Sequence, residues 1–218
     1  MASPVRVTHP PALIHVGPFG AAVARLLASA LPSSALFGSD LDAAFASGSG
    51  PVLVALWRPS PALCDRADRL AYDSGRMVIP IVMEHPTLRI GPVIDPPIGP
   101  CYGCYTARRA QHNTALDASA ALERAFDRDP GFGPLGYLPA HARAAAGVAA
   151  GMIARVGRGG QHAGEVVTLD WISGTMSRTT VVQCGDCPRA ASSSSLRADL
   201  GRIGHELAAA SVPAGGQR

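Results

Sequence analysis

The sequence contains no lysine, and all 19 of its basic residues are arginine. This absence excludes a lysine Schiff base and the phosphate-binding lysine of a Walker loop. Aromatic residues are also scarce, at 5% of a chain that is 47% hydrophobic, which favours an α/β protein with alanine-rich helices. A chain of 218 residues is long enough for one sizeable hydrophobic core.

Long apolar runs are missing as well. No stretch approaches the roughly 18 residues that a membrane-spanning helix needs, and the N-terminus lacks the basic and apolar regions of a secretory signal. We therefore expect a cytoplasmic protein with no membrane partner. The formal charge is only +3, and the arginines are scattered singly apart from Arg108-Arg109, so no nucleic-acid partner is expected either.

Alternating strand and helix patterns occupy the first half of the chain. The segment ALIHVGPFGAAVARLL predicts a buried strand from Leu13 to Val16, a tight glycine turn and a helix. Continuous apolar runs at 51–57 and 77–83 predict strands buried on both faces, with a helix from Leu63 to Ser74 between them. This order predicts a mostly parallel sheet with helical crossovers, a Rossmann-like arrangement.

The second half has a different texture. Glycine and proline crowd the segment after Thr87, which predicts at most a short edge hairpin there. Helices are expected over 114–128 and from His141 to Val156, followed by a β-hairpin over 165–184 with its turn at Ser173-Gly174. We expect one domain over residues 1–189 and a low-complexity, partly disordered tail over 190–218, with one loose helix in it.

Four of the five cysteines form two C-x-x-C pairs, Cys101/Cys104 and Cys184/Cys187. A pair with this spacing on a turn presents two thiolates on the same side of the backbone, and two such turns supply the tetrahedral sulfur set of a structural zinc ion. Four sulfurs leave no coordination position for water, so the metal would stabilise the fold and would not catalyse. It would join the loop after the first sheet strands to the C-terminal hairpin.

Other interpretations of these cysteines remain. A thioredoxin-type redox pair needs one C-x-x-C at a helix N-terminus and leaves the second pair without a role. Four buried structural thiols are less compatible with the glycine and polar neighbours that mark tight turns. Disulfides are disfavoured by the expected cytoplasmic location. The fifth cysteine, Cys64, lies on an expected helix and is interpreted as a small buried side chain rather than a nucleophile.

The glycine turn at Gly17 is similar to a dinucleotide-binding fingerprint but does not match it. Phe19 and Ala22 occupy the positions of the second and third glycines, and a side chain at Phe19 would obstruct the approach of a pyrophosphate. The strand PVLVALW ends in Trp57-Arg58 instead of an acidic ribose partner. No serine elbow, histidine metal motif or recognisable carboxylate pair is present, so no catalytic residue is predicted.

The combined spacing of these segments resembles a known family. The strand-GPFG-helix opening, the segment IGPVIDPPIGPCYGCYTARR and the late CGDCP are similar to the ThiF-like (ubiquitin-activation-type) partner proteins of thiazole/oxazole-modified microcin (TOMM) biosynthesis. The resemblance covers roughly residues 12 to 189, and it implies a ThiF-type fold. The four paired cysteines match the zinc positions of that family.

The resemblance implies an accessory role in making ribosomal peptide natural products. In that family a YcaO-type enzyme performs the ATP-dependent cyclodehydration, and the ThiF-like partner binds the precursor peptide or presents it to that enzyme. Many members carry a winged-helix leader-binding domain first, whereas here the opening strand begins near residue 12, so leader recognition is expected from another chain or from this surface. A homodimer is compatible with the sequence. The alternative is a ThiF-like adenylyltransferase that activates a peptide or protein C-terminus.

Overall fold

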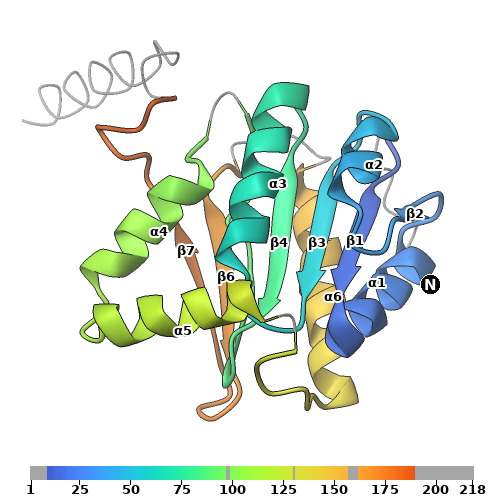
Figure 1. Cartoon of the computed structure of the whole chain (residues 1–218). Coiled ribbons are helices and arrows are strands. Elements are labelled where there is room, and N and C mark those ends of the chain that lie inside the picture. The colour runs from blue at the N-terminus through green and yellow to red at the C-terminus, as the bar shows by residue number, and fades with distance from the viewer. Residues whose placement is uncertain (1–8, 97–98, 130, 157–161, 190–218) are drawn as a thin grey trace, which may run out of the picture.

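The computed structural model describes residues 9–96, 99–129, 131–156 and 162–189. Its helices and strands alternate along the first half of the chain (Figure 1). The strands are β1 (Ala12–Val16), β2 (Ala35–Leu36), β3 (Val52–Leu56), β4 (Val78–Met83), β5 (Thr87–Ile90), β6 (Glu165–Asp170) and β7 (Thr175–Thr180). The helices are α1 (Gly17–Ala30), α2 (Leu41–Ala46), α3 (Pro61–Ser74), α4 (Tyr102–Gln111), α5 (Leu116–Arg128) and α6 (Pro139–Val156).

The seven strands form one mixed sheet in the order β2-β1-β3-β4-β5-β6-β7. Strands β2, β1, β3 and β4 pair in parallel. The pairs β4–β5, β5–β6 and β6–β7 are antiparallel. Because β6 is antiparallel to β5, it runs in the same direction as the parallel strands, so only β5 and β7 run the other way. The sheet is therefore mostly parallel in direction, as the alternation of strands and helices predicts.

Helices cover both faces of the sheet, and alternate residues of each central strand face opposite layers. One core contains Leu13, Leu53 and Ile79 together with side chains from α1 and α6. The other contains Ile14 and Val54 together with side chains from α2, α3 and the start of α4. Figure 1 shows α2 and α3 in front of the sheet and α6 behind it. The continuous apolar runs of β3 and β4 follow from this burial on both faces.

The segment after Thr87 departs from the expectation of an edge hairpin. It forms β5, which pairs with β4 on one side and β6 on the other, and therefore lies inside the sheet. The late pair β6 and β7 supplies the new edge, with Glu165 opposite Thr180 and Asp170 opposite Thr175. A four-residue strand flanked by prolines has too little pattern to reveal these long-range partners.

Two short elements lie where the sequence suggests only a loop. β2 is two residues long and pairs with the start of β1 at the sheet edge. α2 follows it, and the side chain of Asp40 accepts a hydrogen bond from the Ala43 amide at the helix N-terminus (3.0 Å). Because β2 is the second strand of the chain, β3 is the third, and Trp57 is the residue that follows it.

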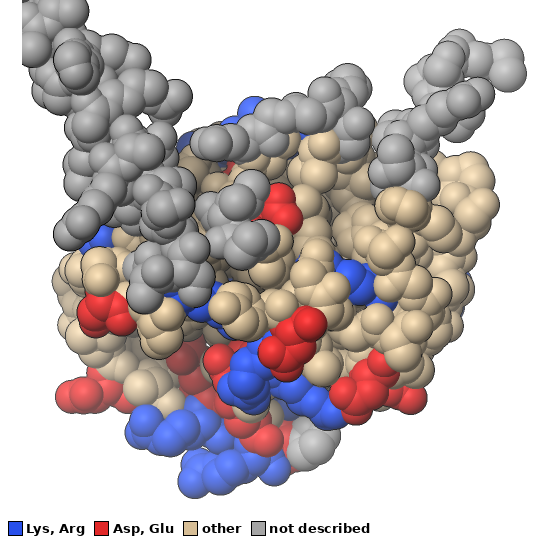
Figure 2. All heavy atoms as spheres, turned by 90° about the horizontal axis from the view of Figure 1, so that it is seen from above, with Lys and Arg blue, Asp and Glu red and all other residues tan. Residues whose placement is uncertain are grey.

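Seen from above, charged side chains of both signs lie mixed along one border of the molecule, and in that view no large area is of one sign (Figure 2). Within the described residues no helix is both long and apolar enough to cross a membrane. The expected tail, 190–218, lies outside the described residues.

Candidate functional site

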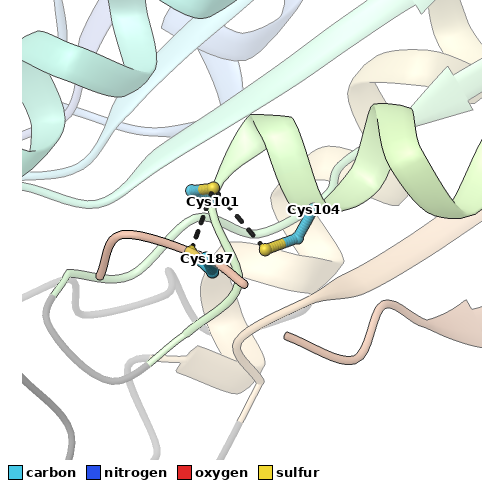
Figure 3. A group of neighbouring side chains, drawn as sticks. All are labelled: Cys101, Cys104 and Cys187. Carbon is cyan, nitrogen blue, oxygen red and sulfur yellow. Dashed lines mark hydrogen bonds between the residues drawn. The ribbon is translucent and has the colours of Figure 1, made fainter. Parts of the chain in front are cut away.

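Three cysteine sulfurs from distant parts of the chain meet at one end of α4. The Sγ of Cys101 lies 3.6 Å from the Sγ of Cys104 and 3.6 Å from the Sγ of Cys187. All three sulfurs lie within 4.8 Å of one another, and Figure 3 shows them converging on the same point. Thiolates at this separation can coordinate one soft metal ion. The donor set therefore fits a metal.

Local backbone structure places each of these sulfurs. Cys101 is the N-cap residue of α4, and Cys104 lies in the first turn of that helix and is buried. The sequence places this pair on a turn, whereas the structure places it at a helix start that the glycine-rich context hides. Cys187 lies in a tight turn after β7, where its amide donates to the Cys184 carbonyl (3.1 Å). This turn follows β7, the strand at the edge of the sheet, so the chain runs from the sheet edge directly to the start of α4.

Cys184 lies beside this cluster, but its sulfur does not join the three. Its backbone amide donates to the Cys104 Sγ (3.3 Å), and its own Sγ lies 3.9 Å from the Cys104 carbonyl oxygen. An amide hydrogen bond to a cysteine sulfur stabilises that sulfur as a thiolate. The described geometry therefore brings together three of the four predicted ligands and places the backbone of the fourth against them.

A buried carboxylate holds both halves of the cluster, and the sequence alone did not identify it. The Oδ1 atom of Asp68, on α3, accepts hydrogen bonds from the Tyr102 amide (3.1 Å) and from Arg189 (2.9 Å). Its Oδ2 atom accepts a second bond from Arg189 (2.8 Å), whose guanidinium also lies over the ring of Tyr72. Tyr102 follows Cys101, and Arg189 comes two residues after Cys187. Asp68 therefore fixes one turn relative to the other.

The thiols differ in how readily they ionise. Burial raises the pKa of Cys101 to about 12, and burial also raises the pKa of Cys104. Burial opposes ionisation of Cys187 too, but hydrogen bonds from the Arg189 backbone and from the neighbouring thiols outweigh it and lower its pKa. A bound cation would favour the thiolate form of all three, so metal binding would release protons.

The redox interpretation finds partial geometric support. The first pair does lie at a helix N-terminus, as a thioredoxin-type motif requires. However, a reactive redox cysteine has a lowered pKa, whereas the pKa of Cys101 is raised, and a third sulfur from a remote segment lies equally close to it. Cys64 is buried on α3, and burial raises its pKa to about 11, which agrees with a structural role.

The glycine turn between β1 and α1 is filled by the protein itself. A Cβ atom at Gly17 would lie 2.1 Å from the Cδ1 atom of Trp57, and one at Gly20 would lie 2.4 Å from the Ala55 carbonyl oxygen. Trp57 is only 4% exposed. The two glycines therefore allow β3 and the residue after it to pack closely against α1, with the indole ring of Trp57 directly against Gly17.

Phe19 does not obstruct the turn as the sequence pattern suggests. Its side chain is buried in the core between the sheet and α6, and its ring packs edge-on against Tyr137 at a centroid distance of 5.6 Å. The obstruction comes instead from Trp57, which is distant in sequence. At this turn the side chain that lies against Gly17 is therefore that of Trp57 and not that of Phe19.

No protein-family model matches the chain, and no curated protein matches it either. Solved structures do share its fold. The heterocyclase TruD superposes with a TM-score of 0.59 at 16% identity, over 83% of this chain and 27% of TruD. The Escherichia coli microcin synthetase complex McbBCD gives 0.60 at 15% identity, over 85% of this chain and 69% of the matched chain.

The E. coli protein MccB, in a structure with ATP, gives a TM-score of 0.57 at 12% identity, over 82% of this chain and 66% of MccB. This chain thus spans about a quarter of the length of TruD and about two thirds of the other two matched chains. The chain has the α/β fold found in a heterocyclase, a microcin synthetase and MccB, which is the fold that its resemblance to the ThiF-like TOMM partner proteins predicts.

Proposed function

We propose that this chain is a non-catalytic partner protein in the biosynthesis of ribosomal peptide natural products of the TOMM class. It binds the precursor peptide, or presents it, to a YcaO-type ATP-dependent cyclodehydratase in the cytoplasm. Support comes from the fold that it shares with a heterocyclase and a microcin synthetase. The observation that supports the non-catalytic part is Trp57 packed against Gly17, from which we infer that the ring hinders a phosphate at the glycine turn.

We also propose that the metal is zinc and that its role is structural. Cys101, Cys104 and Cys187 supply three thiolates. Cys184 supplies the fourth after its side chain turns away from the Cys104 carbonyl, since its backbone already contacts the Cys104 sulfur. Four sulfurs close the coordination shell, so the ion holds α4 to the segment after β7 and activates no water. These segments belong to a single domain over residues 1–189.

A reconstitution experiment tests the accessory role. The chain is added to the YcaO-type enzyme and the precursor peptide encoded by neighbouring genes, and mass spectrometry counts the water molecules lost from the peptide as heterocycles form. We expect little or no heterocycle without this chain and efficient formation with it. Equal heterocycle formation in its absence, together with failure to co-purify with either component, would contradict the proposal.

The second candidate function is a ThiF-like adenylyltransferase, which the likeness to an ATP-containing MccB structure favours. An adenylating enzyme must bind ATP and exchange its pyrophosphate. Because Trp57 fills the turn and the chain has no lysine to contact phosphates, we expect neither saturable ATP binding by calorimetry nor exchange of labelled pyrophosphate into ATP. Exchange stimulated by the precursor peptide would instead establish the adenylyltransferase.

A further inference from the structure

A hollow of about 270 Å³ opens beyond the carboxyl ends of β3 and β4, next to α5. In Figure 1 these strand ends point toward the lower edge of the molecule, along which α5 lies. Open α/β sheets bind ligands in the crevice outside the carboxyl ends of their strands. The volume lies just below the range for drug-sized ligands, so the hollow suits a group of about one residue.

Arg58, the first residue after Trp57, forms the charged wall of this hollow. It is only 7% exposed, and its guanidinium carbon lies 5.2 Å from the centroid of the Trp57 ring and 5.0 Å from that of Phe126. Its terminal nitrogens donate to the carbonyl oxygens of Pro59 (3.3 Å) and Asp129 (3.0 Å). Among the described residues its buried Nε atom has no hydrogen-bond partner.

No described carboxylate forms an ion pair with this arginine. The two acidic residues nearest to it make other contacts. Asp127 accepts hydrogen bonds from the Ala62 amide at the start of α3, and Asp129 accepts one from the Gly131 amide. Burial accordingly lowers the pKa of Arg58, although the nearby carboxylates oppose the shift. A buried arginine keeps its charge, and a nearby anion would offset the cost of burying that charge.

The acidic groups on the rim of the hollow are also paired. Glu84 forms an ion pair with the buried Arg89 (2.8 Å), and Glu123 forms one with Arg109 (2.9 Å). Their charges are therefore offset within the protein, and the positive charge of Arg58 remains the one without a partner carboxylate in the described part of the hollow.

The remaining walls are apolar. Phe126 and Phe132 lie with their ring centroids 5.6 Å apart, and Leu122 lines the same hollow from α5. Phe132 is 44% exposed and Leu122 is 47% exposed, although both are large apolar side chains. Exposed apolar groups beside an unpaired buried charge are typical of a ligand site with a few orienting polar groups.

We propose that this hollow binds a carboxylate next to an apolar side chain of a peptide, with Arg58 contacting the carboxylate and the two phenylalanines packing on the apolar group. The proposal deepens the proposed function and rests on it, because it places one contact of the precursor peptide on this chain. The carboxylate belongs either to a C-terminus or to an acidic side chain, and these two sources share the chemistry that the hollow recognises.

Three small probes test whether a carboxylate is needed for binding and whether it must be a C-terminus or an acidic side chain. N-acetyl-phenylalanine carries a C-terminal carboxylate, N-acetyl-aspartyl-phenylalanine amide carries an acidic side chain, and N-acetyl-phenylalanine amide carries neither. NMR titration of the purified full chain should show one or both carboxylate probes binding at least about tenfold more tightly than the neutral amide, as expected for a hydrogen bond to a charged group. Equal affinity of all three probes would overturn the proposal.

Variants locate the binding. Arg58→Gln should weaken binding of the carboxylate probe at least about tenfold, whereas Arg143→Gln, at an exposed arginine on α6, should not. Phe132→Ala removes a half-exposed part of the apolar wall. It should weaken binding of both the charged and the neutral probes without unfolding the protein, which thermal melting checks. Unchanged affinity in both Arg58→Gln and Phe132→Ala would place the binding elsewhere. These assays use no cyclodehydratase, so the site and the partner function can fail independently.

Discussion

Replacement of Cys101 by serine is expected to remove the bound metal and to lower the melting temperature by roughly 5–20 °C. A covalent cross-link between remote segments is typically worth about 2–5 kcal/mol, and the proposed zinc ion would join α4 to the segment after β7 in a similar way. For a chain of this size each kcal/mol corresponds to about 2–4 °C. Cys101 is chosen because its sulfur is 3.6 Å from both other sulfurs.

The matched control is Cys64→Ala. This cysteine is buried on α3, outside the three-sulfur cluster, and its raised pKa keeps it a neutral thiol. Its replacement should leave the metal content unchanged and cost only the packing of one sulfur atom. Elemental analysis and thermal melting of both variants, beside the unmodified chain, make the comparison. A Cys101→Ser protein with full metal content and an unaltered melting temperature would contradict the metal site.

Substitution of Asp68 by asparagine is expected to have the second large effect. Removal of one charge from a buried ion pair typically costs about 3–5 kcal/mol, because the remaining charge is left without a partner. Asp68 and Arg189 form such a pair, with side chains 5% and 18% exposed. The same carboxylate accepts a hydrogen bond from the backbone amide of Tyr102, which follows Cys101. We therefore also expect the affinity for the metal to fall about 10–100-fold.

The Asp68 experiment includes a readout that a merely structural residue would not change. Competition with a chromophoric chelator measures metal affinity under conditions in which the variant remains folded. Asp65→Asn is the control, since Asp65 lies one turn earlier on the same helix and forms only an exposed ion pair with Arg69. If Asp68→Asn lost stability but held metal as tightly as the Asp65→Asn control, the carboxylate would have no part in positioning the ligands.

The parts of the fold that the sequence predicts are those with a strong local pattern. The apolar run of β3 and the alternating strands β6 and β7 carry enough periodicity to identify them, and the C-x-x-C spacing identifies Cys101, Cys104 and Cys187 as members of a cluster that could hold a metal ion. In these cases neighbouring residues are enough for the prediction: an apolar run indicates a strand buried on both faces, and a C-x-x-C pair indicates two thiolates on one side of a turn.

The parts that the sequence does not predict depend on partners far along the chain. β5 is recognisable only from its pairing with β6, and the C-x-x-C motif hides the helix α4 that begins at Cys101. Trp57 covers the glycine turn from another strand, and Asp68 reaches Arg189 across 121 positions. A polar residue with such a partner has no local signature, so the carboxylate that joins the two cysteine turns could be identified only from the structure.

The most direct test of this account is the metal content of the full chain, purified without chelator and measured by inductively coupled plasma mass spectrometry. The account predicts one zinc ion per chain, held by the cysteines of α4 and of the turn after β7. Protein that is folded, active as a partner in heterocycle formation and free of zinc or any other bound metal would contradict it.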